Sequence, residues 1–325
     1  MRKIILFISC IMITVMFTSC GRTIRLTGEN IITKAQAEYQ ETTVPTTVAT
    51  VTTVPATEPA TEGKPQHLNV NTKMPKDYKL PESCVIKGFE TVMQEPELPT
   101  GCEITALAQT INFYGFDIDK VELCDVFMPV DYDGYYTMDD VYLGDPHSTN
   151  GFGCNAPVIT NTANDYFDYI GSDWYAKNLS GISLDEVFYQ IEQGRPVVIW
   201  TTIDQRETHA VFEFRLGCGE DFYFNPYQHC VTIYGYDKEK GIVNIADPLK
   251  GNVEYDMDRF SRIYEVMEKQ AVVLIGNEES KGKVYTSKKE QKKWLEKNRP
   301  KEEDTTTSSS TTKTSTKTTS TGKAT

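Results

Sequence analysis

Three side chains that together could perform nucleophilic catalysis lie far apart in this chain of 325 residues. They are the thiol of Cys102, the imidazole of His229 and the carboxylate of Asp247. A thiolate is a strong nucleophile, an imidazole can take up its proton, and a carboxylate can orient that imidazole. Their types and order therefore predict a cysteine nucleophile with its base and its orienting acid. His209 is the alternative base, although no Asp-Pro pair at a strand end follows it as Asp247-Pro248 follows His229.

The residues around Cys102 predict a helix over 102–114. Apolar side chains recur after it at three- and four-residue intervals, and Gly115 follows as the expected end. Thr100 or Gly101 can cap the start, which places the thiol at the helix N-terminus. The partial positive charge of that terminus stabilises a thiolate, so we expect a reactive sulfur.

His229 and Asp247 belong to a predicted β-hairpin. Residues 229–237 and 241–247 alternate as strands do, and a short turn at 238–240 joins them. In an antiparallel pair, the start of one strand lies beside the end of the next. We therefore expect the imidazole and the carboxylate to be neighbours.

The order of predicted elements indicates the fold class. Helices come first and strands follow, which favours an α+β fold with an antiparallel sheet over repeated βαβ units. The predicted helices are 102–114, 119–127, 157–170 and 183–191, and the predicted strands are 196–201, 210–214, 229–237, 241–247 and 271–275.

Four segments carry a resemblance to a known family, bacterial peptidase-like domains similar to the double-glycine leader (bacteriocin-processing) peptidases. These are residues 96–103, 144–153, 229–237 and 247–249. The family is papain-like, so the resemblance implies a papain-like cysteine peptidase fold, with N-terminal helices packed on an antiparallel sheet. The leader peptidases act while fused to transporters. We see no transporter segment here and do not expect their double-glycine substrate.

The resemblance also implies roles for individual residues. Cys102 becomes the nucleophile, His229 the general base and Asp247 the group that orients it. Gln94 becomes an oxyanion donor beside the backbone amide of Cys102. This chemistry needs no cofactor and no metal. The acidic stretches at 131–134 and 139–140 fit solvated loops better than a calcium site.

The N-terminus predicts export. A basic start and an apolar stretch over 4–17 precede Phe17-Thr18-Ser19-Cys20, which resembles a bacterial lipobox. We expect Cys20 to be diacylated and to anchor the chain in the lipid bilayer on the extracytoplasmic face, since two acyl chains anchor stably. An ordinary signal peptide is the alternative.

Composition divides the chain into four parts. Residues 1–20 are the lipoprotein signal peptide, 21–75 a Thr/Pro-rich disordered tether, and 76–278 the peptidase-like domain. Residues 279–325 are a Lys-rich and then Thr/Ser-rich disordered tail, with one helical stretch around 288–297.

Charge and cysteine content limit the classes of molecule that the domain can bind. Residues 76–275 hold 34 Asp and Glu against 14 Lys and Arg, which argues against nucleic acid and tolerates a peptide or protein substrate. The cysteines of the domain form no CxxC pair, so zinc-ribbon spacing is absent, and their disulfide pairing stays open. These are Cys84, Cys102, Cys124, Cys154, Cys218 and Cys230.

The sequence thus predicts an extracytoplasmic, membrane-anchored cysteine peptidase-like hydrolase that cleaves a peptide or amide bond through an acyl-enzyme. Two alternatives stay open. One is acyl transfer on peptidoglycan, as an amidase or transpeptidase performs it. The other is a non-catalytic peptide-binding module on the same fold.

Overall fold

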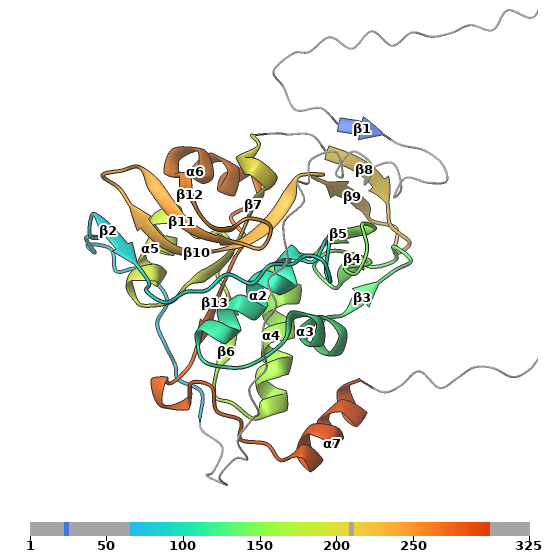
Figure 1. Cartoon of the computed structure of the whole chain (residues 1–325). Coiled ribbons are helices and arrows are strands. Elements are labelled where there is room, and N and C mark those ends of the chain that lie inside the picture. The colour runs from blue at the N-terminus through green and yellow to red at the C-terminus, as the bar shows by residue number, and fades with distance from the viewer. Residues whose placement is uncertain (1–22, 26–65, 208–210, 300–325) are drawn as a thin grey trace, which may run out of the picture.

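A seven-stranded sheet forms the centre of the protein (Figure 1). The computed structural model describes residues 23–25, 66–207 and 211–299. The strand order is β12-β11-β10-β7-β13-β6, β2 also pairs with β10, and every pairing is antiparallel. This confirms the predicted fold class. The strands are β2 (Ser83–Val85), β6 (Tyr175–Asn178), β7 (Val197–Thr202), β10 (Gln228–Asp237), β11 (Ile242–Asp247), β12 (Gly251–Asp256) and β13 (Ala271–Ile275).

Helices cover both faces of this sheet. On one side α2 packs on β10 and α4 on β13, with α3 beside both helices, whereas α5 and α6 lie on the other side (Figure 1). The helices are α2 (Cys102–Phe113), α3 (Lys120–Phe127), α4 (Ala156–Ile170), α5 (Leu184–Glu192) and α6 (Met257–Val266).

The sheet carries a hydrophobic core on each face because side chains alternate along its strands. In β7, Val198 and Trp200 belong to the core beneath α2 and α4, and Val197 and Ile199 belong to the core beneath α5. All four side chains are buried. A strand buried on both faces has no polar side, which explains the continuous apolar run in the sequence.

Two smaller sheets extend the α2 side of the molecule. One has the order β3-β4-β5, and the other has the order β1-β8-β9. Phe152 from the first and Phe214, Phe222 and Phe224 from the second form one aromatic cluster. The strands are β1 (Thr23–Arg25), β3 (Val130–Asp131), β4 (Tyr142–Gly144), β5 (Gly151–Gly153), β8 (Val211–Arg215) and β9 (Asp221–Phe224).

Helix α6 and strand β12 are absent from our sequence prediction. The Asp256 side chain caps α6 by accepting from the Arg259 amide, and Phe260, Ile263 and Tyr264 are buried. This spacing is that of an amphipathic helix, so the pattern was present in the sequence. The helix is short, and the charged residues between its apolar positions mask the pattern.

The packed chain extends beyond both predicted boundaries of the domain. Before residue 76, Thr72 is buried and accepts hydrogen bonds from Lys177 and Gln190. After residue 278, helix α7 (Lys288–Asn298) forms at the predicted helical stretch and places Trp294 against Phe127. Residues 1–22, 26–65 and 300–325, which include the predicted signal peptide and most of the predicted tether and tail, lie outside the described residues. Within the described part, no helix is long and apolar enough to cross a membrane.

Candidate active site

Polar contacts fix helix α2 along strand β10. The Thr232 hydroxyl donates to the Ala106 carbonyl at 3.1 Å. The Gln109 amide donates to Thr232 Oγ1 at 2.8 Å and to the Ala246 carbonyl at 3.1 Å. Because buried hydrogen bonds of this kind tolerate little displacement, they set the helix register on the sheet. Cys102, the first residue of α2, consequently lies beside the beginning of β10.

The sulfur of Cys102 lies beside a part of β10 that is paired on one edge alone. This strand pairs with β7 along 228–233, but its register with β11 begins only at Thr232. On the edge without a paired strand, the backbone amide of Cys230 donates a hydrogen bond to the buried Cys102 sulfur. The sulfur therefore lies beside the backbone of Cys230, which follows His229 in β10.

His229 and Asp247 form a buried pair, which confirms that the predicted hairpin makes them neighbours. His229 Nε2 donates to Asp247 Oδ1 at 2.7 Å, and the two side chains are 1% and 0% exposed. The other carboxylate oxygen accepts from the Tyr255 hydroxyl at 2.7 Å, and the Leu249 amide donates to Oδ1 at 2.8 Å. The carboxylate is thus held from three directions and can fix the imidazole ring.

The pKa of Asp247 is lowered to about 2. Burial by itself would raise this pKa, but the attraction of His229 and the hydrogen bonds from His229, Tyr255 and the Leu249 amide outweigh burial. Asp247 is therefore ionised at neutral pH and remains an acceptor for the ring N–H.

The second ring nitrogen of His229, Nδ1, is available as a proton acceptor. Among the described residues, none makes a hydrogen bond with the buried Nδ1 atom. Since Nε2 carries the proton that goes to Asp247, a neutral ring has its lone pair on Nδ1. A buried acceptor without a partner is costly, so Nδ1 is a site prepared for a donor such as a thiol.

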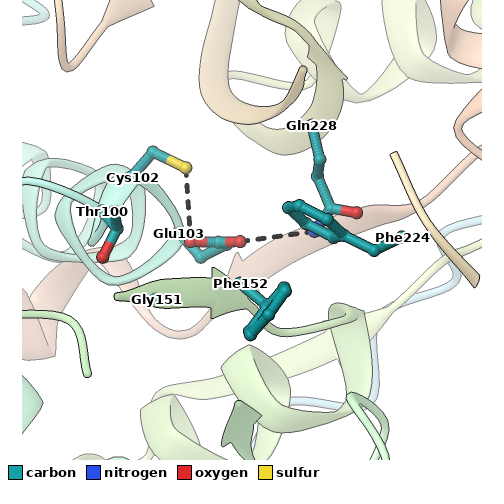
Figure 2. Close-up of a pocket in the computed structure, with 7 residues that line it drawn as sticks. All are labelled: Thr100, Cys102, Glu103, Gly151, Phe152, Phe224 and Gln228. Atoms are coloured by element: carbon teal, nitrogen blue, oxygen red, sulfur yellow. Dashed lines mark hydrogen bonds between the residues drawn. The ribbon is translucent and has the colours of Figure 1, made fainter. Parts of the chain in front are cut away.

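The Cys102 thiol instead contacts Glu103 (Figure 2). It donates to Glu103 Oε2 at 3.3 Å, and both side chains are buried. Burial raises the pKa of Cys102 well above its usual value, the Glu103 carboxylate raises it further, and the Cys230 amide opposes them. The direction of this pKa shift is opposite to the one expected from the helix N-terminus, because burial and the Glu103 carboxylate both disfavour the thiolate.

Glu103 occupies a niche between α2, β5 and β10. Its Oε1 accepts from the Cys154 amide at 3.2 Å and from the Gln228 side chain at 3.5 Å. Burial raises the pKa of Glu103, and these hydrogen bonds oppose that rise. Gly153 has a φ of +115°, and a Cβ there would lie 2.3 Å from Glu103 Oε1. Glycine at this position therefore leaves the room that the carboxylate fills.

A very small cavity adjoins Cys102 (Figure 2). Its volume is about 10 Å³, and Phe152 and Phe224 stand on the side opposite Cys102. A cavity of this size is at the lower limit of what can hold one water molecule. A substrate side chain can enter here only if these aromatic rings move. The cavity is lined by Thr100, Cys102, Glu103, Gly151, Phe152, Phe224 and Gln228.

Gln94 lies between the segment before Cys102 and the end of β11. Its backbone amide donates to the Pro248 carbonyl at 2.9 Å, and its side-chain amide donates to the Pro99 carbonyl at 2.6 Å. One proton of the side-chain NH₂ group is thus engaged within the loop. The predicted oxyanion role stays a prediction.

Other residues considered from the sequence have different places. His147 contacts Asp125 of α3 and the Glu97 carbonyl, whereas His209 and Cys20 lie outside the described residues. The Asp131 carboxylate accepts from the backbone amides of the following turn, which occupies the oxygens that calcium would need. The six cysteines of the described chain are free thiols: Cys84, Cys102, Cys124, Cys154, Cys218 and Cys230.

Two site residues escaped the sequence prediction. Tyr255 lies on β12, where Val253 and Tyr255 alternate with Glu254 and Asp256, so a period-two signal was present. Glu103 was placed correctly in the first turn of α2. Its burial against the sulfur depends on Gly153 and Gln228, which are distant in sequence.

The sheet, the helix that begins with a cysteine and the His–Asp pair define a papain-like cysteine peptidase fold. Residues 86–272 match the Peptidase_C39 like family, and the chain belongs to this family. Over 186 residues it is 30% identical to the uncharacterized protein YvpB of Bacillus subtilis strain 168, covering 56% of this chain and 72% of YvpB. The solved structure of a candidate C39-like peptidase from Bacillus anthracis is 26% identical, with a TM-score of 0.54, and the match covers 60% of this chain and 98% of that one.

Proposed function

We propose that this protein is an extracytoplasmic, membrane-anchored cysteine peptidase in which Cys102, His229 and Asp247 carry out catalysis. One observation carries the proposal. The buried imidazole of His229 is oriented by Asp247 through a 2.7 Å hydrogen bond and keeps Nδ1 without a partner among the described residues. The next residue along the strand touches the candidate nucleophile. Membership of a peptidase-like family supports the same reaction class.

The chemistry follows the general scheme of thiol-dependent acyl transfer. The Cys102 proton passes to His229 Nδ1, and the thiolate attacks the carbonyl carbon of a peptide bond. The imidazolium then gives its proton to the departing amine, which leaves an acyl-enzyme that water hydrolyses. Before the first step, the thiol must exchange Glu103 for His229 as its acceptor. Rotation about the Cα–Cβ bond of Cys102, driven by substrate that displaces Phe152 and Phe224, would do this.

The oxyanion would be stabilised by two donors. The backbone amide of Cys102 is at the helix N-terminus, where N–H groups lack helical partners. Gln94 Nε2 carries two protons, and the Pro99 carbonyl accepts one of them at 2.6 Å. The second proton is available for a developing negative charge.

The experiment for catalysis uses an electrophilic acyl probe and a fluorogenic peptide library. We expect the probe to label the wild-type chain and cleavage to be detectable, and we expect both to be lost in Cys102→Ala, because the probe reports the nucleophile itself. Cys218→Ala is the matched control, since Cys218 is an exposed thiol that is not among the candidate catalytic residues. Labelling that persists in Cys102→Ala, or that vanishes in Cys218→Ala, would refute the assignment.

A non-catalytic peptide-binding module is the second candidate. The raised pKa of Cys102 and the small cavity beside it favour this reading, since a protonated and covered thiol is a poor nucleophile. In the same experiment, a Cys102 that reacts no faster than a free cysteine, together with retained peptide binding, would favour the binding module. Turnover of cell-wall fragments without turnover of peptides would favour acyl transfer on peptidoglycan.

Export and anchoring rest on the sequence motif alone. The proposal places diacylated Cys20 in the membrane and the peptidase domain outside it, joined by the Thr/Pro-rich tether. We expect Cys20→Ser to move the protein from the membrane fraction to the soluble fraction of a bacterial host, because the acyl chains supply the anchor. Mass spectrometry of the wild-type N-terminus checks the lipid directly, and an unmodified Cys20 in the membrane fraction would contradict this part of the proposal.

A further inference from the structure

A second group of metal-ligating side chains lies away from the candidate catalytic residues. Cys124 and Asp125 come from the second half of α3, and His147 comes from the loop between β4 and β5. One donor atom from each lies within 4.8 Å of the other two. We propose that Cys124, Asp125 and His147 bind one divalent metal ion of the zinc class, with water as the fourth ligand.

The orientation of His147 supports a metal ligand. Its Nδ1 atom is 3.3 Å from the Glu97 carbonyl oxygen, and its Nε2 atom is 2.6 Å from Asp125 Oδ1. A carbonyl oxygen can only accept, so the tautomer with a proton on Nδ1 donates to Glu97 and turns the lone pair of Nε2 toward the carboxylate. Metal-ligating histidines commonly donate one N–H to a backbone carbonyl and bind the metal through the other nitrogen.

In the tautomer that protonates Nδ1, the lone pair of Nε2 faces the Asp125 carboxylate oxygen, which is also an acceptor. A divalent cation placed beside these two atoms can bind both of them, and it can also bind the Cys124 sulfur, which belongs to the same 4.8 Å group.

Cys124 completes a donor set that suits zinc. The side chain is 1% exposed, and its thiol hydrogen-bonds to the Asp125 carboxylate. Thiolate sulfur, imidazole nitrogen and carboxylate oxygen are all common ligands of Zn²⁺, and the sulfur disfavours magnesium and calcium.

The geometry is within reach of tetrahedral coordination. Zinc–ligand bonds of about 2.0–2.3 Å put ligand atoms on the order of 3.5 Å apart. The contact of 2.6 Å between His147 and Asp125 must widen, and both side chains are free to move because they are 38% and 50% exposed. Zinc binds the thiolate form of cysteine, so binding releases the thiol proton and affinity should rise with pH.

The proposed site is connected to the segment before Cys102. His147 contacts the Glu97 carbonyl, and the Thr100 hydroxyl donates to the Asp145 carbonyl at 3.2 Å and to the Ser148 carbonyl at 2.9 Å. A metal at this position would join α3 to both the 145–148 loop and the 97–100 segment. It would act as a structural clamp, whether or not Cys102 is catalytic.

The test titrates Co²⁺ and then Zn²⁺ into the full-length chain after treatment with a chelator. We expect one equivalent to bind, with the thiolate-to-cobalt charge-transfer absorption that a cysteine ligand gives. Cys124→Ser should abolish that absorption. Because Cys124 is buried and its variant could misfold, the exposed-site variants His147→Gln and Asp125→Asn provide a second measurement. Each should weaken Zn²⁺ binding at least about 10-fold.

Cys218→Ser is the matched control, since it removes an exposed thiol outside the group. Its cobalt spectrum and zinc affinity should equal those of the wild type. The proposal is overturned if the wild type binds no stoichiometric metal at neutral pH, or if His147→Gln and Asp125→Asn bind Zn²⁺ as tightly as the wild type does.

Discussion

Replacing His229 with Ala is expected to lower kcat/KM for a cleaved peptide by about 10³-fold or more. General-base catalysis contributes about 10²–10⁴-fold, and here the same group must also deprotonate a thiol whose pKa is raised by burial and by Glu103. Little thiolate would form without the imidazole. Steady-state kinetics on the best substrate of the peptide library measure the change, and circular dichroism checks that the variant is folded.

His67→Ala is the matched control for this variant. His67 is a histidine whose Nδ1 contacts the Asp173 carbonyl at 2.8 Å, apart from the candidate catalytic residues. It should retain wild-type kinetics. A folded His229→Ala variant with more than a tenth of the wild-type kcat/KM would rule out His229 as the base.

Asp247→Ala is expected to have the second largest effect, on both stability and activity. It leaves the buried ring N–H of His229 and the Tyr255 hydroxyl without their acceptor, and each unsatisfied buried polar group costs about 1–3 kcal/mol in the free energy of unfolding. Loss of the orienting group should also lower kcat/KM at least about 10²-fold. Urea denaturation and the same kinetic assay measure the two effects.

Asp247→Asn is the informative comparison. Its side-chain oxygen can still accept from the His229 ring, whereas its NH₂ group would face the Tyr255 hydroxyl oxygen, and papain-like peptidases can use asparagine as the third member of the triad. We expect this variant to be more stable and more active than Asp247→Ala. If both variants lose stability and kcat/KM equally, the site requires the negative charge of Asp247 rather than only the orientation that it gives to His229.

The Asp247 carboxylate should also make stability depend on pH. Its pKa falls from 3.8 to about 2 on folding, so the folded state favours the ionised form. This contribution is about 2 kcal/mol, is complete above about pH 4, and is lost as pH falls toward 2. The Asn variant should lack this part of the acid dependence, and urea denaturation between pH 2 and pH 5 would show the difference.

The sequence predicted the features that depend on local pattern. The start of α2 at Cys102 and the β10–β11 hairpin are visible as periodicity and turn chemistry, and the His229–Asp247 contact follows from the hairpin. The capping box at Ser183 likewise placed α5 correctly.

The features that were missed depend on contacts between distant segments. The shift in the pKa of the Cys102 thiol is set by burial and by Glu103. Gln228 donates to the Glu103 carboxylate and Gly153 leaves room for it, and both residues belong to other elements. Similarly, Cys124 and His147 are 23 positions apart, and they meet only because the 145–148 loop folds back onto α3. No spacing rule connects such residues, since the approach is set by tertiary packing.

The hydrogen bond between Cys102 and Glu103 has a consequence for chemical survival. Oxidants such as peroxide attack the thiolate, so a sulfur that is kept protonated and covered is slow to form a sulfenic acid. A protonated and covered thiol is also slow to attack the disulfide bonds of other molecules. Under the proposed export and catalysis, an exposed thiolate outside the reducing interior of a cell would be short-lived, and the Glu103 carboxyl would protect the Cys102 thiol until a substrate enters the site.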